Sequence, residues 1–406
     1  MSRVILLDHQ ATTPILPEVF ETMRPFFAEA FGNPSSFHQH GLRARDALAK
    51  AREQMAALIH AESPEEIIFT SGGTEATNLA VKGAAWAGQR RGKHIVLSEI
   101  EHPAVTQAVE FLQGHGFTAT RVKVDAAGRI DPAAVQAALT DQTILVALHL
   151  VNHEIGTIQP LQQIGGIIAE RGIPFFVDAT FATGWLPVDA RTLQASLLSL
   201  SAHRFHGPKG CGVLYRHRRA RLTPLLHGGE QEGGLRAGVE NVPAIVGAGQ
   251  AAEIAQRELA GRMAAIAGLQ QRLWDNIECS VPYVQLNGPA VGPERVFTNL
   301  NVSVEFAEGE AVVLAADMAG MALASGSSCL GKSVKISPVL AALGLDPALA
   351  AGSILATLGC DNTADEMDRA AESLARIVAR LRGMSPMWDD FESGRMDSLI
   401  SPRVVS

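Results

Sequence analysis

Candidate catalytic and ligand-binding residues occur in a few short stretches of the sequence. One of these stretches is FTSGGTEATNLAVKG at residues 69–83. An apolar run there ends in Thr-Ser-Gly-Gly-Thr, and a helical pattern follows. Glycine lets a backbone approach a ligand closely, the free N–H groups of a first helical turn favour an anion, and Thr74 adds a hydroxyl. Gly73 and Thr74 are therefore candidates for a phosphate cradle. The alternative is an ordinary helix cap formed by Ser71 or Thr74.

A second candidate is Asp178, which ends the buried apolar run of FFVDAT. A carboxylate in such surroundings needs a cationic or protonated partner. The protonated pyridine nitrogen of a bound cofactor is one such partner. A structural arginine is the other.

Histidines form a third group. His102 in SEIEHPAV, His153 in LVNHEIG and His203 in LSAHRF lie at or just after predicted strand ends, and His206 lies in the loop beyond. The carboxyl edge of an α/β sheet is where ligands bind. A lone histidine is usually structural, but several on one edge favour a site.

The cysteines are widely spaced and include no C-x-x-C pair, which argues against a zinc ribbon or a disulfide framework and favours the reducing cytoplasm. Cys329 stands among small residues in LASGSSCLGKS, where a nucleophilic or sulfur-carrying thiol would have room to move. Cys211, Cys279 and Cys360 are interpreted as packing residues.

The hydrophobic pattern indicates the elements that position these residues. Runs rich in Val, Ile, Leu and Phe alternate with helical stretches such as 75–91 and 132–141. This alternation predicts an α/β fold with a mainly parallel sheet covered on both faces. The strand-like runs are residues 94–100, 118–124, 143–151, 174–180, 195–202 and 212–217.

The last third of the chain changes character. A long helical run at 251–277 leads to a strand-like run at 297–306, and further helices end near 376–384. This order predicts a second, smaller α+β domain. The tail from residue 385 to 406 is expected to be only partly structured.

Composition limits the classes of function. The chain has 406 residues, 47% of them hydrophobic, and a formal net charge of -8 at pH 7. This charge does not draw the chain to nucleic acid or to an anionic membrane. No run is long enough to span a bilayer, and the first residues do not read as a secretory signal. A cytoplasmic location is therefore expected.

Many motifs in order carry a resemblance to a known family. They are LLDHQATTP, FGNPSS, SGGTEATN, EHPAV, NHEIGTIQP, VDAT, SAHRFHGPKGCGVLY, HGGEQEGGLRAG, ASGSSC and SPMWDDFESG. Together they make the chain resemble the cysteine desulfurases, within the class V aminotransferase group of pyridoxal-phosphate enzymes. The resemblance implies a fold type I homodimer. It also implies a large domain at 13–255 and a smaller domain, formed by 1–12 and 256–406, that carries the Cys329 loop.

The resemblance also implies a reaction. In this family pyridoxal phosphate forms a Schiff base with a lysine and then with substrate cysteine, and its ring acts as an electron sink. A loop cysteine attacks the substrate sulfur, leaving alanine and an enzyme persulfide. The final motif is similar to the family's tail that docks iron–sulfur scaffold proteins, which implies a scaffold or another sulfur acceptor as a partner.

Most family positions are retained. By resemblance, Gly73 and Thr74 match the phosphate turn, His102 the histidine that stacks on the ring, Asp178 the partner of the ring nitrogen, Ser201 and His203 the residues before the lysine, Cys329 the persulfide cysteine and Asn33 a substrate-binding asparagine.

The departures fall in the same pocket. Arg204 stands where the Schiff-base lysine belongs, and arginine stays protonated and cannot serve as an ordinary imine-forming amine. Lys209 is no substitute, because the family has a lysine there as well. The other departures are Phe181 for a ring-contacting glutamine, His153 for an asparagine beside the ring, Val239 for a threonine that reaches the phosphate from the other subunit, and Leu355 for the arginine that holds the substrate carboxylate.

Three hypotheses follow. The first is a desulfurase-like protein of sulfur transfer and iron–sulfur cluster assembly that is impaired in pyridoxal chemistry, with Arg204 paired to Asp178. The second is an active desulfurase that uses non-covalent pyridoxal phosphate. The third is a repurposed metal or cluster site, although the sequence spacing gives no metal signature. Its ligands would be His102, His153, His203, Asp178 and Cys329.

Overall fold

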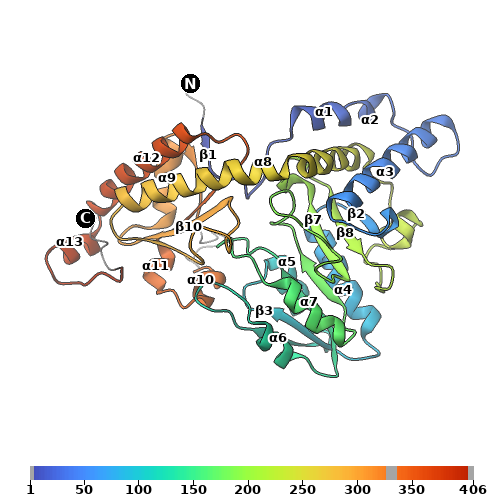
Figure 1. Ribbon diagram of the computed structural model, residues 1–406, viewed down its shortest axis with the longest axis horizontal. Coiled ribbons are helices and arrows are strands. Elements are labelled where there is room, and N and C mark those ends of the chain that lie inside the picture. Colours follow the sequence, from blue (N-terminus) through green and yellow to red (C-terminus); the bar gives the residue numbers. More distant parts are fainter. Residues whose placement is uncertain (1–3, 326–335, 401–406) are drawn as a thin grey trace.

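The computed structural model describes residues 4–325 and 336–400 (Figure 1). Within them, the largest sheet has seven strands in the order β2-β8-β7-β6-β5-β3-β4. Strand β8 is antiparallel to both of its neighbours, and the other pairings are parallel. The strands are β2 Ile67–Thr70, β3 His94–Ser98, β4 Thr118–Val122, β5 Thr143–His149, β6 Phe175–Asp178, β7 Leu197–Ser201 and β8 Gly212–Arg216.

Successive strand residues point to opposite faces of this sheet, and both faces are buried. In β5, Leu145 and Ala147 pack into the apolar cluster beneath helices α4 and α5, whereas Val146 and Leu148 pack into the main core on the other face. All seven residues of β5 are buried. A strand covered on both faces reads as a continuous apolar run, which is why the sequence pattern predicted a parallel sheet.

Helix α8 runs from the large sheet to a second, smaller sheet (Figure 1). It spans Val242–Ser280, so it begins nine residues before the helical run predicted at 251–277. The Asn241 side chain caps it by accepting the Ala244 N–H, and a proline follows in the first turn. The division predicted between residues 255 and 256 falls inside this helix and stays a prediction.

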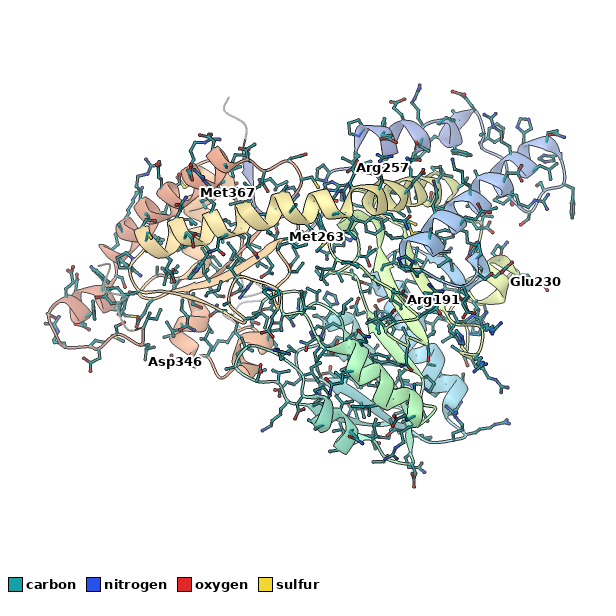
Figure 2. The ribbon with its side chains drawn as sticks, viewed as in Figure 1. Arg191, Glu230, Arg257, Met263, Asp346 and Met367 are labelled. Atoms are coloured by element: carbon teal, nitrogen blue, oxygen red, sulfur yellow. The ribbon has the colours of Figure 1, made fainter. Side chains whose placement is uncertain are left out.

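The smaller sheet has the order β12-β13-β10-β9, and β1 pairs with β11 beside it. Helix α12 packs along α8, and Met367 of α12 and Met263 of α8 both lie in or against the main core (Figure 2). The strands are β1 Ile5–Leu6, β9 Val284–Leu286, β10 Asn299–Val304, β11 Met321–Ala322, β12 Ala324–Ser325 and β13 Ser353–Thr357. The other α-helices are α1 Pro17–Met23, α2 Pro25–Ala28, α3 Gln39–Leu58, α4 Gly73–Gly88, α5 Pro103–Gln113, α6 Pro132–Ala138, α7 Leu161–Glu170, α9 Gly309–Met318, α10 Pro338–Ala342, α11 Pro347–Ala351, α12 Ala364–Arg382 and α13 Pro386–Glu392.

The described part of the tail is partly helical, as expected, whereas the interpretation of two cysteines as packing residues was wrong. The tail is helical over α13, and its Trp388 and Phe391 rings pack against Tyr283 and Phe306. Aromatic packing of this kind is a tertiary contact that local sequence does not reveal. Of the three cysteines interpreted as packing residues, only Cys211 is buried, and burial raises its pKa to about 12; Cys279 and Cys360 are exposed.

A buried arginine connects the two sheets. The Nη1 of Arg295 donates to the Ile155 carbonyl, beyond β5, at 2.9 Å and to Asn299 Oδ1, in β10, at 3.1 Å, while its Nε donates to the Pro289 carbonyl at 2.9 Å. Burial lowers the pKa of this guanidinium to about 9, so it stays protonated near neutral pH. A buried cation satisfied by carbonyl dipoles costs much free energy when its hydrogen bonds are removed.

We therefore expect Arg295→Ala to lower the free energy of unfolding by about 3 kcal/mol or more, since it leaves several buried carbonyls unpaired. Urea unfolding followed by circular dichroism measures this. The matched control is Arg272→Ala, which removes an exposed guanidinium paired with Asp368 and should change little. Equal effects of the two substitutions would contradict the role given to Arg295.

Candidate active site

The candidate site residues meet at the carboxyl edge of the large sheet. Strands β2, β6 and β7 point the same way and end at Thr70, Asp178 and Ser201. Their ends therefore lie at one edge, as the sequence argument required. An inner cavity of about 60 Å³ there is lined by Gly73, Thr74, Thr77, His102, Ala104, Asp178, Thr180, Phe181, Ser201, His203 and Arg204.

Two further compartments adjoin this inner cavity. An outer hollow of about 440 Å³ shares Gly73, Thr74, Ser201 and His203 with it. A compartment of about 30 Å³, on the side of the smaller sheet, shares Thr180, Phe181 and Arg204. Arg204 thus stands between the inner cavity and the boundary of the two sheets.

The outer hollow opens over the first turn of α4. A Cβ at Gly73 would meet the Ser201 Cβ at 3.2 Å, so a larger residue would crowd the floor of the hollow. A Cβ at Gly72 would meet nothing within 4 Å, so this side is open. Free N–H groups at the start of a 16-residue helix suit a phosphate group.

Asp178, which also lines the inner cavity, is held by hydrogen bonds. It is buried, and its Oδ1 accepts the Ser199 hydroxyl at 3.1 Å and the Thr180 N–H at 3.0 Å. The Thr77 hydroxyl in turn lies 3.3 Å from the Ser199 Oγ. These donors suit an ionised carboxylate that faces a cationic group in the cavity.

Three aromatic rings pack together beside the inner cavity, and two of them, His102 and Phe181, line it. The His102 and His153 rings pack edge to face at 5.1 Å, and both lie within 6 Å of the Phe181 ring. Burial lowers the pKa of His102 and holds the pKa of His153 well below its ordinary value. Burial, together with the cations Arg204 and Lys209, lowers the pKa of His203 to about 4. All three imidazoles are therefore neutral near pH 7.

Arg204 follows β7 in the short helical turn Ala202–Arg204. Its guanidinium carbon lies 4.4 Å from the centroid of the Phe181 ring. Within the described residues, its Nε and Nη1 are buried without hydrogen-bond partners, and the guanidinium forms no ion pair. The predicted pairing with Asp178 is therefore wrong: the two groups line one cavity but do not come within ion-pair distance. Burial lowers the pKa of Arg204 to about 10, which leaves it protonated at neutral pH.

Several predicted residues lie elsewhere. Asn33 is exposed and its Oδ1 accepts the Ser35 N–H at 2.9 Å, outside the three compartments. Val239 is 60% exposed and lines a separate hollow beside Thr70. Leu355 is buried in β13 opposite Asn301. His206 is buried with its Nδ1 3.0 Å from the Pro14 carbonyl.

The metal hypothesis draws no support from the described part of the chain. Within it, no group of three or more His, Cys, Asp or Glu side chains could hold a metal ion. Cys329 lies outside the described residues. No described helix is long and apolar enough to cross a membrane.

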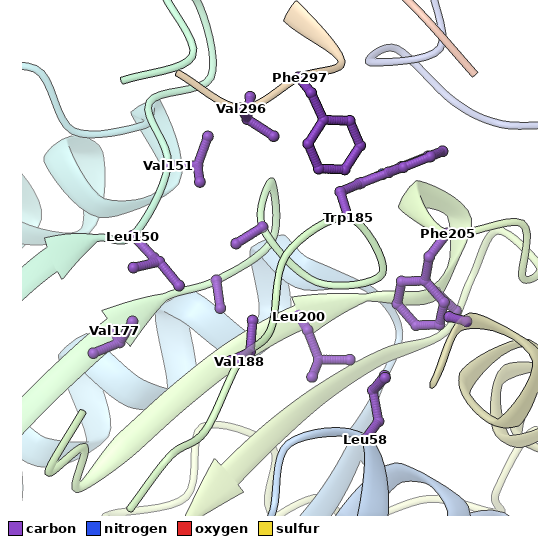
Figure 3. Close-up of a cluster of buried hydrophobic side chains, with 14 of the residues drawn as sticks. Leu58, Leu150, Val151, Val177, Trp185, Val188, Leu200, Phe205, Val296 and Phe297 are labelled. Atoms are coloured by element: carbon purple, nitrogen blue, oxygen red, sulfur yellow. The ribbon is translucent and has the colours of Figure 1, made fainter. Parts of the chain in front are cut away.

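The sequence analysis did not predict the residues that line the small compartment between the two sheets. Trp185 lines the small compartment with Arg204, and its Nε1 donates to the Arg204 carbonyl at 2.9 Å. Val151 and Val296 line the same compartment and belong with Trp185 to the apolar cluster in Figure 3. Single apolar residues on distant segments carry no motif, so only the fold could bring them together.

The retained residues fit pyridoxal phosphate in part. The hollow over α4 suits its phosphate, and buried Asp178 suits a protonated ring nitrogen. The covalent anchor does not fit, because a guanidinium takes the place of an amine. Gly73, Thr74 and Asp178 could therefore hold the cofactor through non-covalent contacts.

The sequence matches the family described as aminotransferase class V over residues 5–370. A Dictyoglomus turgidum protein named cysteine desulfurase IscS is 43% identical over 392 residues, which are 97% of this chain and 99% of the relative. A protein of the same name from Methanosarcina thermophila is 42% identical over 386 residues, 95% of each chain.

Solved structures agree with these relatives. A NifS-like protein superposes with a TM-score of 0.87 at 32% identity, covering 93% of this chain and 100% of its own. DndA from Streptomyces lividans superposes with a TM-score of 0.73 at 35% identity, covering 86% and 97%. The fold is that of the fold type I pyridoxal-phosphate enzymes, so the predicted fold class is confirmed. The chain belongs to the cysteine desulfurase family within the class V aminotransferases.

A buried carboxyl beside the site provides a pH test. Burial raises the pKa of Glu154 to about 7, against the opposing hydrogen bond donated by Ser337. Its Oε1 lies 3.6 Å from the His153 Nε2. The folded state thus keeps the Glu154 proton at pH values where the unfolded chain, with a pKa near 4.5, has lost it.

Stability should therefore fall as the pH rises from about 4.5 to about 7, by on the order of 3 kcal/mol from this group. Glu154→Gln should remove that slope and leave the protein relatively more stable at pH 7. Urea unfolding at a series of pH values measures it. Glu372→Gln, on the exposed face of α12, is the control. A slope unchanged in Glu154→Gln would refute the assignment.

Proposed function

We propose that this chain is a desulfurase-like protein of sulfur transfer and iron–sulfur cluster assembly in which ordinary pyridoxal-phosphate chemistry is impaired. The observation that carries the proposal is the Arg204 guanidinium, which lies in the inner cavity at the position of the family's lysine. Relatives named cysteine desulfurase support the sulfur-transfer part. The departures in the pocket support the impairment.

The physical reason is the charge of residue 204. A nucleophilic amine must lose its proton, and a guanidinium with a pKa of about 10 does not do so near neutral pH. Even when neutral, its lone pair is delocalised over three nitrogens. When bound, pyridoxal phosphate supplies an electron sink. The groups at Gly73, Thr74 and Asp178 hold and orient a ligand, but residue 204 gives it no covalent anchor.

Loss of the substrate clamp strengthens the proposal. Leu355 stands where the family's arginine holds the substrate carboxylate, and it is buried in β13 opposite Asn301 of β10 and Ala324 of β12. A leucine donates no hydrogen bond. A substrate held without this contact would lose orientation as well as affinity.

The proposal includes a cytoplasmic homodimer that passes sulfur to a partner. Exposed aromatic side chains in the N-terminal segment support a dimer: Phe27, Phe31 and Phe37 are 63%, 67% and 89% exposed. Apolar surface of this kind is usually covered in an assembly. The partner would be an iron–sulfur scaffold protein or another sulfur acceptor, and Cys329 would carry the sulfur.

The alternative is an active cysteine desulfurase, which converts L-cysteine to L-alanine with a persulfide on Cys329. Two observations favour it: relatives with 43% and 42% identity carry that name, and the groups for the phosphate and the ring nitrogen are retained. It requires pyridoxal phosphate to act without a lysine. The following experiment separates the two functions.

Purified protein is incubated with pyridoxal phosphate, reduced with borohydride and analysed by peptide mass spectrometry. We expect no cofactor mass on the peptide containing residue 204 and no sulfide from L-cysteine. Arg204→Lys should gain that mass, because an amine replaces the guanidinium. Arg204→Gln is the matched control, since it removes the charge without supplying an amine.

Two results would count against the proposal. Wild-type protein that keeps a cysteine-sensitive yellow chromophore and releases sulfide is an active desulfurase. If Arg204→Lys gains no mass, Arg204 is not the limiting defect, and Phe181 and Val239 become the residues responsible.

A further inference from the structure

A hollow of about 510 Å³ lies along strand β9 of the smaller sheet, and it is larger than each of the three compartments of the candidate active site. Val284, Gln285 and Leu286, which make up the whole of β9, all line it. Successive side chains of a strand point to opposite faces, so a hollow lined by all three residues lies along the edge of the strand. Much of the remaining wall is apolar and is formed by Trp274, Val281, Pro282, Val291 and Ile400.

The backbone of β9 has a free side. Strand β9 is the outermost strand of its sheet and pairs antiparallel with β10, and no other described strand pairs with it. Beside it, the Asn287 N–H donates to the Asn301 carbonyl at 2.9 Å. Hydrogen-bonded and non-bonded pairs alternate along an antiparallel ladder, so the N–H and C=O groups of Val284 and Leu286 face away from β10. This edge can therefore pair with one more extended segment.

Glu305 holds the last described residues at the wall of this hollow. It is buried directly after β10, and its Oε1 accepts the Leu399 N–H at 2.7 Å. Its Oε2 accepts the Ser398 hydroxyl at 2.6 Å and the Ile400 N–H at 3.3 Å. Ile400 itself lines the hollow. Residues 401–406, SPRVVS, lie outside the described residues and follow Ile400 directly, so the chain enters this segment at the hollow.

We propose that residues 401–406 of the same chain occupy this hollow as an additional strand on the free edge of β9 and cover the Cys279 thiol, which also lines it. Six extended residues span about 20 Å at most, and the three residues of β9 span about 10 Å, so the segment is long enough. The β-branched Val404 and Val405 favour a strand. Pro402 has no N–H and is tolerated at the start of an edge strand.

Tethering favours this occupant over a separate peptide. Because Glu305 fixes Ile400 at the wall, the following residues have an effective concentration on the order of millimolar at the edge of β9. Charge is complementary as well, since Glu278 lines the hollow and Arg403 belongs to the segment. A covered edge cannot pair with the strand of another molecule, so the segment would protect the protein from edge-to-edge association. The inference is independent of the proposed function.

The first test is the reactivity of Cys279 in the full-length protein, measured as the rate of alkylation by iodoacetamide with peptide mass spectrometry. Replacing Val404 and Val405 together by serine should raise this rate about fivefold or more, because the segment then undocks more often. Cys360 is the internal control, since it is also exposed and lies near Arg262, roughly 25 Å from Cys279 along α8. Its rate should stay unchanged.

The second test identifies the occupant through a disulfide. Val404→Cys and Val405→Cys are made separately in the full chain and treated with diamide, which takes up the two hydrogens of the joined thiols. Neighbouring side chains of a strand point to opposite faces, so one variant should form a disulfide with Cys279 at least about fivefold faster than the other. Peptide mass spectrometry identifies the bond, and a non-reducing gel should show a monomer band. The matched control adds Cys279→Ser and should lose the bond.

Several results would overturn the inference: a Cys279 rate that does not change in the double serine variant, no disulfide to Cys279 from either engineered position, or a disulfide to another cysteine instead. A dimer band on the non-reducing gel would assign the hollow to the segment of a second copy and would refute docking within one chain. Thermal unfolding checks each variant. The disulfide test stands even if the double serine variant fails to fold.

Discussion

The guanidinium of Arg204 lies over the Phe181 ring, and two of its nitrogens are buried without partners among the described residues. Burying a cation costs several kcal/mol, and contact with an aromatic face returns only about 2 kcal/mol. The electrostatic attraction of the Asp178 and Asp8 carboxylates offsets a further part of this cost. The pocket therefore tolerates a charge that it does not fully satisfy within the described residues.

The large sheet makes this constraint possible. Parallel strands that end at one edge bring together residues far apart in sequence, such as Gly73 after β2, Asp178 at the end of β6 and Arg204 after β7. Because both faces of the sheet are packed, these ends cannot shift to relieve an unfavourable charge. The Arg204 side chain therefore stays in the cavity. In a less tightly packed protein, so long a side chain would turn toward solvent.

The second sheet completes the site from the other side. Val296, Thr298 and Thr357 close the small compartment, and Arg295 fixes their position by bonding to carbonyls on both sides of the boundary. Leu355 is buried in strand β13 of this second sheet. The hollow over α4 that suits a phosphate is lined by Gly72 and Gly73.

The sequence by itself determined the fold class and the kinship, because apolar runs alternating with helices specify a covered parallel sheet and the motifs are specific in order. It also gave the residue types at the sheet edge. The tertiary structure decided the contacts: that Arg204 stacks on Phe181 rather than pairing with Asp178, that Asn33 lies outside the cavity, and that Trp185 lines the adjoining small compartment. Side-chain direction and burial depend on packing between distant segments, which no local pattern encodes.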